Sequence, residues 1–272
     1  MKKVVERIRQ ITHDYVKNAG LKALIIGESG GIDSALTTVL LRPICDELGI
    51  KLIGRSITIE TNTNEERQRS NDIGTAFCHD FKEIDLTQLY HTTLDTIEEL
   101  PYEEDTTSKD YRLRVGNIKA RLRMIYLYNL AQKHRGMVIS TDNQTEWQLG
   151  FWTLHGDVGD FDPLFGLWKT EVYHVSKYIC STLTDEKQKA ALQACIDCVP
   201  TDGLGITSSD VEQLGAKHYD EVDAALWAYM KDGSNSINPK VIARHKASAF
   251  KRVNPVFITR EEIFGDSDPL QQ

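Results

Sequence analysis

The sequence predicts an α/β fold of three layers, in which helices cover both faces of a mostly parallel, twisted sheet. Residues 21–27 read LKALIIG, a nearly continuous apolar run of the kind found in strands buried on both faces. Similar runs alternate along the chain with segments whose apolar residues recur at helical spacing. This alternation implies right-handed crossover connections and a parallel sheet. The 272 residues show no repeat and no linker, so we expect a single domain over residues 1–272.

The helices and strands can be placed in chain order from the spacing of the apolar residues. The N-terminal segment has Val4, Ile8 and Ile11 on one stripe and predicts an amphipathic helix. Strands are expected at residues 21–27, 51–59, 81–86 and 136–141. Helices are expected at about residues 34–48, 64–77, 111–134, 171–183, 186–195, 209–214, 219–231 and 239–250. The acidic segment 98–110 predicts a mobile loop, and segment 142–169, rich in Gly and Asp, predicts a functional loop.

The charge and hydropathy of the chain limit the classes of partner that it can bind. Its formal net charge of −8 argues against broad nucleic-acid binding, which favours a basic surface. One anionic small ligand remains compatible with this charge, because such a ligand needs only a local basic cluster. No apolar run approaches the roughly 20 residues that span a bilayer, and the N-terminus lacks the apolar core of a secretory signal. We therefore expect a cytoplasmic protein that binds neither nucleic acid nor a membrane.

The five cysteines favour a structural interpretation. Their odd number and the missing secretory signal indicate reduced thiols. Cys195 and Cys198 form a single CxxC pair, but a zinc site would need two further ligands and no second pair of this kind is present. A thioredoxin-like redox pair would directly follow a strand, whereas this pair follows a helical pattern. We interpret both as partly buried helix residues.

The strongest motif is SGGIDS over residues 29–34, between a buried strand and a helix. Gly30 and Gly31 allow the backbone to approach an anion, and the N–H groups of the following helix point towards it. Ser29 and Ser34 add hydroxyl donors. The motif is not a Walker A loop, which needs a Lys before the Ser, and it is not a GxGxxG fingerprint. The alternative is a plain glycine-rich turn between strand and helix.

This loop resembles the SGGxDS loop of the N-type ATP pyrophosphatases, which have a Rossmann-like fold. The resemblance implies that the loop grips the pyrophosphate leaving group of ATP and that an adenylated intermediate forms. It assigns ATP contacts to a run of loop residues: Gly27, Ser29, Gly30, Gly31, Ile32, Asp33 and Ser34. A carboxylate beside pyrophosphate is reasonable only with a cation between them, so Asp33 is assigned to Mg²⁺. The alternative for Asp33 is a helix cap.

A second motif, VGNIKARLRM over residues 115–124, resembles the GNxKARxRM helix of NAD synthetases. Asn117 and Arg121 are four residues apart and therefore share one helix face. The resemblance implies that both bind deamido-NAD near the interface of a homodimer. Leu113 stands where relatives often carry an aromatic residue. The alternative is a basic helix face in solvent.

A third motif, residues 140–157, is similar to the [GS]TxNxxExxxGyxTxxGD signature of the same family. It implies that Thr141 contacts ATP, that Glu146 coordinates Mg²⁺, and that Asp157 lies near the nicotinate end of the substrate. Lys169 matches a lysine that faces the phosphates. The stretch after Asp157 is about one residue shorter than usual, so the roles of Asp160 and Asp162 stay open.

Two further matches are weaker. Arg55 on the second strand matches an arginine near ATP, and Lys251 belongs to a segment similar to the C-terminal HKRxxP motif, which implies substrate contact. The resemblance spans about residues 3–258 and implies an ammonia-dependent NAD synthetase. This enzyme would amidate deamido-NAD with ATP and Mg²⁺ through an NAD-adenylate, with Asp33, Asp157 and Lys169 as its catalytic residues. Asp157 is the candidate base that deprotonates ammonium.

The position of the first expected strand bears on the source of the nitrogen. The first strand is expected only about twenty residues from the N-terminus, which leaves no room for the glutaminase domain of some relatives and predicts the use of free ammonia. One alternative is another ATP pyrophosphatase, such as a tRNA-modifying enzyme, although a basic face is then expected. The other alternative is a non-catalytic nucleotide sensor that has kept the fold. The presence of Asp33 and Glu146 disfavours a sensor, because a protein that only binds a nucleotide needs no paired metal ligands.

Overall fold

The computed structural model describes residues 1–60, 62–97, 105–199, 211 and 214–265. Its centre is a four-stranded sheet in the order β3-β2-β1-β4, and every pair of neighbouring strands is parallel. The strands are β1 (Ala23–Gly27), β2 (Lys51–Thr58), β3 (Asp80–Asp85) and β4 (Gly136–Ile139). Their register places Ile25 opposite both Ile53 and Val138. The predicted α/β fold with a parallel sheet is confirmed.

The strand order contains one switch point, between β1 and β4. The chain moves outwards from β1 to β2 and β3, and then returns to place β4 on the other side of β1. Ligands of open α/β sheets bind in the crevice at the carboxyl ends of the strands beside such a point. The loops that follow β1 and β4 both begin at this crevice, so the fold brings SGGIDS next to the motif that begins at Ser140.

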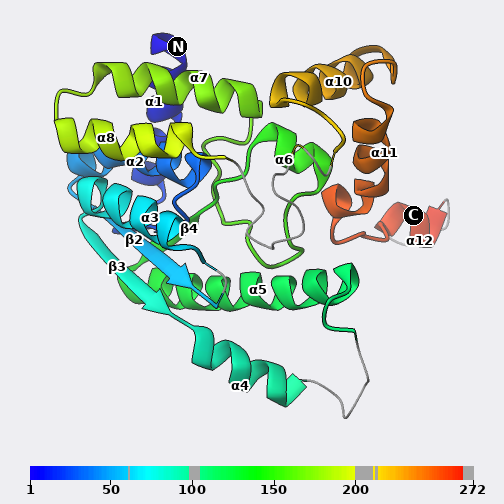
Figure 1. The fold of residues 1–272 in the computed structure, drawn as a ribbon, viewed down its shortest axis with the longest axis horizontal. Coiled ribbons are helices and arrows are strands. Elements are labelled where there is room, and N and C mark those ends of the chain that lie inside the picture. Colours follow the sequence, from blue (N-terminus) through cyan, green and yellow to red (C-terminus); the bar gives the residue numbers. More distant parts are fainter. Residues whose placement is uncertain (61, 98–104, 200–210, 212–213, 266–272) are drawn as a thin grey trace.

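Helices cover both faces of the sheet, as predicted (Figure 1). One face packs against α5 (Lys109–His134) and α4 (Thr87–Ile97) through Ile25, Ile53 and Val138. The other face packs against α1 (Lys2–Asn18) and α2 (Ile32–Leu48) through Leu24, Ile26 and Leu52. Successive residues of β1 therefore point to opposite faces, and the four from Ala23 to Ile26 are all buried, which explains why the strand reads as one continuous apolar run.

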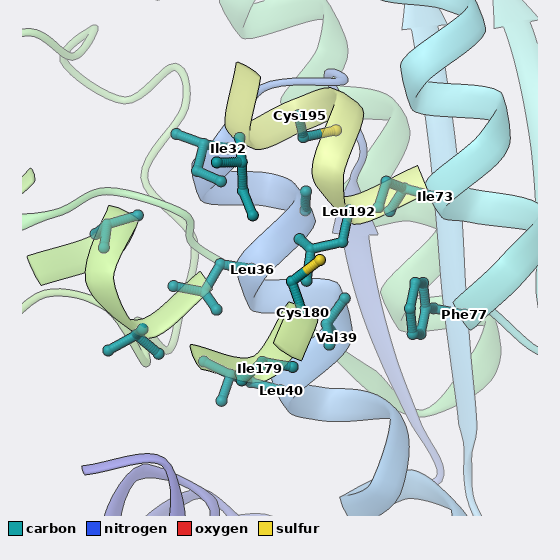
Figure 2. Packing of buried hydrophobic residues seen from close by; sticks show 14 of the residues in the cluster. Ile32, Leu36, Val39, Leu40, Ile73, Phe77, Ile179, Cys180, Leu192 and Cys195 are labelled. Carbon is teal, nitrogen blue, oxygen red and sulfur yellow. The ribbon is translucent and has the colours of Figure 1, made fainter. Parts of the chain in front are cut away.

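Further helices pack against α2, and the first of them also packs against β2 and β3. Here α3 (Asn64–Phe77), α7 (Lys169–Thr182) and α8 (Glu186–Asp197) enclose an apolar cluster (Figure 2). Leu36, Leu192 and Cys195 are fully buried in it. Cys195 therefore serves as a core residue, and Cys198 follows at the end of α8 with its thiol directed to the Cys195 carbonyl at 3.2 Å. Both thiols are free, in keeping with the structural interpretation.

The C-terminal helices form a separate group beside the sheet (Figure 1). They are α10 (Tyr219–Asp232), α11 (Pro239–Ala247), the 3-10 helix η1 (Ala249–Val253) and α12 (Arg260–Phe264). Leu226 and Ile242 of this group pack around Leu149 of the short helix α6 (Gln144–Leu149). The group thus supports the segment that carries the third motif. No helix in the described ranges combines the length and the apolar character needed to cross a membrane.

Several boundaries differ from the prediction. Helices α4, α6 and α12 were not predicted, because their sequences lack a long periodic stripe. Tertiary contact stabilises α4, whose Tyr90 is 3% exposed against α5, while Asn143 caps the single turn and a half of α6. Helix α2 begins two residues before the expected start, because Gly31 is its N-cap. Most of the expected loop 98–110 and most of the expected helix 209–214 lie outside the described residues.

Candidate active site

A cavity of about 780 Å³ opens at the carboxyl edge of the sheet, between the loop after β1, the segment after β4, α5 and the C-terminal helices. Every predicted site residue except Gly30 lines it. Ten basic and six acidic side chains belong to the described lining. The cavity is therefore basic although the chain as a whole carries −8, which is the electrostatic pattern of a site for a polyanionic ligand.

The phosphate loop is held from outside by α3. Gly30 has φ +79°, and a Cβ there would lie 2.5 Å from the Glu66 carbonyl oxygen and 2.9 Å from Ser70 N. Arg69 Nε donates to the Gly30 carbonyl at 2.9 Å, and the hydroxyls of Ser29 and Ser34 are 3.1 Å apart. A glycine is thus required at position 30 because a side chain there would clash with α3. The sequence predicted a different requirement, the close approach of an anion to the backbone.

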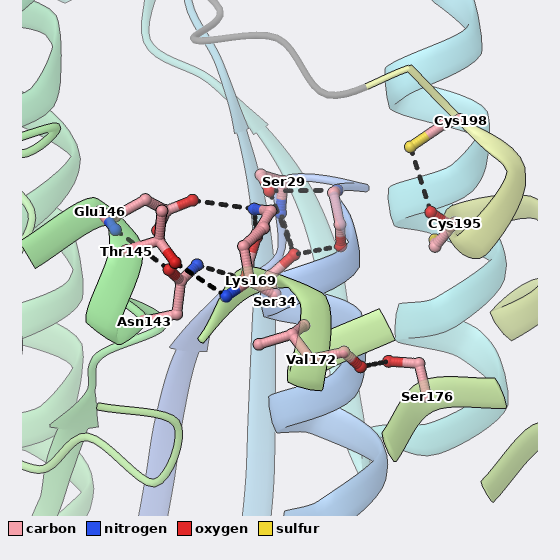
Figure 3. A network of polar contacts seen from close by, with 12 residues as sticks. Ser29, Ser34, Asn143, Thr145, Glu146, Lys169, Val172, Ser176, Cys195 and Cys198 are labelled. Atoms are coloured by element: carbon pink, nitrogen blue, oxygen red, sulfur yellow. Dashed lines mark hydrogen bonds and ion pairs between the residues drawn. The ribbon is translucent and has the colours of Figure 1, made fainter. Parts of the chain in front are cut away.

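Three charged groups from distant parts of the chain meet beside this loop, and Figure 3 labels two of them, Lys169 and Glu146. Lys169 Nζ donates to Asp33 Oδ2, and it donates to Glu146 Oε1 at 2.8 Å. Lys169 is 3% exposed, and although burial disfavours its charge, Asp33 and Glu146 hold its pKa well above the usual range. Asn143 Nδ2 donates to Asp33 Oδ1 at 2.8 Å. Asp33 is therefore not the helix cap, a role that Gly31 has.

The two carboxylates suit a magnesium ion. Asp33 and Glu146 converge on one cationic atom, which shows that both can face the same positive charge. Within the described residues, no three His, Cys, Asp or Glu side chains are arranged to hold a metal by themselves. Mg²⁺ is commonly held by one or two carboxylates together with substrate phosphates, so this pair fits the ion when a nucleotide completes the shell.

Arg55 reaches the cavity wall with its charge already paired. Its Nη1 donates to Asp80 Oδ1 at 3.0 Å and to the Gly54 carbonyl at 2.7 Å. Its Nε is buried and has no hydrogen-bond partner in the described part of the chain. The structure therefore brings Arg55 to the site, together with the neutralising carboxylate of Asp80.

The predicted substrate residues of α5 contact the segment that follows α6. Asn117 Oδ1 accepts from Thr153 Oγ1 at 2.8 Å, and Arg121 Nη2 donates to the Leu154 carbonyl at 3.1 Å. From the other side, Lys251 Nζ donates to the Gly150 carbonyl at 2.7 Å and to the Trp152 carbonyl. Arg121 and Lys251 thus bond the backbone of segment 150–157 from two directions, and Asn117 bonds the Thr153 side chain.

Asp157 closes this segment and faces the cavity. Its Oδ1 accepts from Thr153 N at 2.7 Å. Solvent in the cavity reaches the residue, yet the walls desolvate its carboxyl and raise its pKa to about 6. The neighbouring aspartates have local partners, since Asp160 accepts from Tyr128 OH at 2.7 Å and Asp162 accepts from Leu164 N at 2.9 Å. Those contacts fix the shortened stretch after Asp157.

Sequence analysis missed Asp223, which positions two site helices. Its carboxylate accepts from Thr145 Oγ1 at 2.5 Å and from Thr170 N at 2.9 Å. Thr145 Oγ1 also accepts from Lys169 N at 2.8 Å. One carboxylate of α10 therefore holds the residues beside Glu146 and Lys169. The signal in the sequence was a charged residue, Asp223, next to Val222 on the apolar face of a predicted helix. In the structure Asp223 is 7% exposed.

Two more acids near the site were also missed. Asp142 is 9% exposed and accepts from Ser140 Oγ at 2.7 Å. Burial, followed by the nearby charges of Asp157 and Glu146, raises its pKa well above the usual range. Glu28 is 1% exposed and lies directly before the phosphate loop. A polar residue between apolar strand residues and a glycine-rich loop was the signal for Glu28.

The fold and the cavity define a class of α/β proteins in which a glycine-rich loop after the first strand meets paired carboxylates, a lysine and a basic wall, the features of a site for a nucleotide. Comparison with known proteins then identifies the family. The family model for NAD synthase matches residues 4–257, and the chain belongs to this family. It is therefore a ligase that forms a carbon–nitrogen bond, converting deamido-NAD to NAD with ATP.

Individual relatives agree with this assignment. The chain is 30% identical over 253 residues to the NH(3)-dependent NAD(+) synthetase of Mesoplasma florum, covering 93% of this chain and 94% of the relative. It is 31% identical over 254 residues to the protein of the same name from Methanosarcina mazei, covering 92% and 89%. Among solved structures, the NMN synthetase from Francisella tularensis matches with a TM-score of 0.75 and 25% identity, covering 95% of this chain and 97% of that one.

Proposed function

We propose that the chain amidates deamido-NAD with free ammonia through an NAD-adenylate, and that both steps take place in the basic cavity. The observation that carries the proposal is the meeting of Asp33, Glu146 and Lys169 beside the phosphate loop. A carboxylate is a poor electrophile, because its leaving group would be oxide. Activation by ATP solves this problem, and it requires a site that neutralises several negative charges at once.

In the first step, a carboxylate oxygen of the nicotinate attacks the α-phosphorus of ATP. The bond between the α-phosphorus and the bridging oxygen breaks, and pyrophosphate leaves with the electron pair. The N–H groups at the start of α2 and the Ser29 hydroxyl would bind the leaving group, and the Ser34 hydroxyl, which donates to Glu28, would have to turn to do so. Lys169 contributes a buried positive charge at the same point. Mg²⁺, held by Asp33 and Glu146, would supply additional charge neutralisation at the phosphates when bound.

In the second step, ammonia attacks the activated carbonyl and AMP leaves with the electrons of the broken carbon–oxygen bond. The nitrogen must lose a proton during the reaction, and Asp157 is our candidate acceptor. Its position on the cavity wall and its pKa of about 6 support this role, since it is ionised at neutral pH and is more basic than an ordinary aspartate. Asn117, Arg121 and Lys251 would hold segment 150–157 against the substrate.

A homodimer is part of this proposal. Leu113, Ile125 and Tyr128 on α5 are each at least 40% exposed, and an apolar surface on the helix that carries Asn117 and Arg121 supports a partner there. Light scattering on the purified chain should give twice the mass of one chain. An active monomer would contradict this expectation.

We also propose that the chain works as a single domain in the cytoplasm. Its five cysteines are free, and three of them are buried. This supports a compartment in which thiols stay reduced.

A second candidate reaction is amidation of the corresponding mononucleotide. The likeness to an NMN synthetase favours it, as does Leu113, an aliphatic residue of the cavity wall that cannot stack on an adenine as an aromatic ring does. The chemistry at the carboxylate would be the same for both substrates. Only the half of the cavity that receives the second nucleotide would differ.

The experiment that tests the proposal measures amide formation from ATP, Mg²⁺ and ammonium with either deamido-NAD or nicotinate mononucleotide. Glutamine replaces ammonium in a parallel reaction. We expect NAD from deamido-NAD with ammonium, little product with glutamine, and release of AMP and pyrophosphate. A larger kcat/KM for the mononucleotide would favour the second candidate. Absence of any amide product, with ATP still bound, would contradict both.

A further inference from the structure

Glu28 is a buried carboxyl group beneath the phosphate loop, and the reaction described above gives it no role. It lies between the end of β1 and Ser29, and although it is 1% exposed it reaches the wall of the cavity. Its carboxylate accepts three hydrogen bonds, from Ser34 Oγ at 2.5 Å, from Thr38 Oγ1 at 2.7 Å and from Gly30 N at 3.3 Å. A buried acid with this many donors is held in a defined position.

The negative charge of this carboxylate has no cationic partner. In the described part of the chain no lysine or arginine forms an ion pair with Glu28, whereas Asp33 and Glu146 share Lys169. Burial raises the pKa of Glu28 to about 7, and the hydrogen bonds from Ser34, Thr38 and Gly30 oppose that shift. An ionised carboxylate here repels a phosphate bound to the loop, since little solvent screens the two charges.

Two of the three donors belong to the phosphate loop itself. Sequence analysis assigned the Ser34 hydroxyl and the loop N–H groups to phosphate oxygens, but the Ser34 hydroxyl and the Gly30 N–H instead donate to Glu28. A serine hydroxyl has one proton, so Ser34 cannot donate to Glu28 and to a phosphate oxygen at the same time. Binding of pyrophosphate to this loop therefore has to replace an internal hydrogen bond.

We propose that Glu28 is an internal anion that competes with the pyrophosphate group for the donors of the loop, and so weakens binding of ATP and of the pyrophosphate product. The inference rests on the proposed function, because it takes the loop as the pyrophosphate site. Weaker retention of pyrophosphate favours its release after adenylation, which keeps the first step from running backwards. Glu28 thus determines affinity and takes no part in the chemistry.

The test compares Glu28→Gln with the unchanged chain by calorimetry at pH 8.5, where the carboxyl is ionised. The titrants are Mg²⁺-pyrophosphate and an ATP analogue with a methylene between the α- and β-phosphates. The amide keeps the size of the side chain and removes its charge, so we expect both ligands to bind about tenfold more tightly. Unchanged or weaker binding would overturn the proposal. Glu47→Gln, on the exposed end of α2, is the matched control and should bind as the unchanged chain does.

A double-mutant cycle with Ser34 makes the test specific. In the unchanged chain Ser34→Ala removes a hydroxyl that is occupied by Glu28, so pyrophosphate affinity should change less than threefold. In the Glu28→Met background, which has no oxygen acceptor at this position, the same substitution should cost about tenfold, because the hydroxyl is then free to donate to phosphate. Equal effects in the two backgrounds would contradict the competition. Glu28→Met is of similar length and without charge, and if Glu28→Gln does not fold it also replaces that variant in the calorimetry.

Calorimetry and NAD formation together separate the role of Glu28 from the proposed function. Calorimetry measures affinity without turnover, so a chain that binds pyrophosphate and forms no NAD would leave the role of Glu28 testable. A chain that forms NAD and shows no change in affinity in Glu28→Gln would refute the inference alone.

Discussion

The two halves of the active site are built in different ways. The phosphate loop is formed by eight consecutive residues, 27–34, between β1 and α2, and its backbone is supported from outside by Arg69 and Ser70 of α3. The acceptor half, residues 140–169, contains one short helix and depends on side chains far away in the sequence. Asp223 holds its start through Thr145, and Lys251 holds segment 150–157.

This difference corresponds to two requirements, binding a phosphate and activating a carbonyl group. A phosphate is bound by backbone N–H groups, whose directions follow from local strand-to-helix geometry. A carbonyl that must be activated and then attacked needs charged groups at fixed positions, and a loop cannot fix them without tertiary contacts. The C-terminal helices supply those contacts, although no predicted catalytic residue belongs to α10 or α11.

The largest effect is expected where the two halves join. Asp33→Asn and Glu146→Gln should each lower kcat by roughly 100- to 1,000-fold, because each removes one of the two carboxylates that face Lys169 and the proposed metal. Steady-state NAD formation measures this, with thermal melting as the check that the fold survives. Glu6→Gln, exposed on α1, should keep full activity. More than half of the activity in either variant would remove the metal assignment.

The next effect concerns proton transfer in the acceptor half. Asp157 must be ionised to accept a proton, and its pKa is raised to about 6, so kcat should fall about tenfold per pH unit below pH 6. Asp157→Asn should lower kcat about 100-fold and abolish this acidic limb. The measurement is a pH profile at constant free ammonia. Asp160→Asn, a neighbour that accepts from Tyr128, should keep the limb. A limb that persists in Asp157→Asn would assign the base elsewhere.

A smaller effect should follow from loss of the hydrogen bonds that Asp223 accepts from Thr145 and Thr170. Thr145→Val breaks the contact between α6 and α10, and Asp223→Asn leaves one acceptor oxygen for two donors, Thr145 Oγ1 and Thr170 N. In each variant kcat should fall about tenfold while the KM for ATP changes less than twofold. Thr145→Ser keeps the hydroxyl and should restore most of the rate, and Asp220→Asn on the exposed side of α10 should have no effect. Equal losses in kcat and in ATP binding would mean that the two halves are not independent.

The smallest effect is expected for the contact of Lys251 with segment 150–157. Lys251→Met removes the ammonium that bonds the Gly150 and Trp152 carbonyls, so the KM for deamido-NAD should rise about fivefold and the KM for ATP should stay unchanged. Lys246→Met, whose ammonium lies over the Tyr229 ring, is the matched control on the same C-terminal helices. A rise in the KM for ATP would place Lys251 in the phosphate half.

The sequence by itself determined the strands, the position of the phosphate loop and a set of site residues, all of which except Gly30 line the cavity. Each of these depends on a local signal: a continuous apolar run, a glycine pair between strand and helix, or a motif of consecutive residues. The parallel sheet then had to place the ends of β1 and β4 side by side, because β4 returns to the other side of β1. For this reason the loop and the motif after β4 could be expected in one site.

Only the tertiary structure decided which partners those residues have. Lys169 bridges two carboxylates that lie 136 and 23 residues away, and Thr145 meets Asp223 across 78 residues. The structure also showed that Gly30 is needed for packing against α3 and that the Ser34 hydroxyl donates to Glu28. Periodicity and motif spacing report on neighbours along the chain. Hydrogen bonds between distant elements depend on packing, and packing is settled only when the whole chain folds.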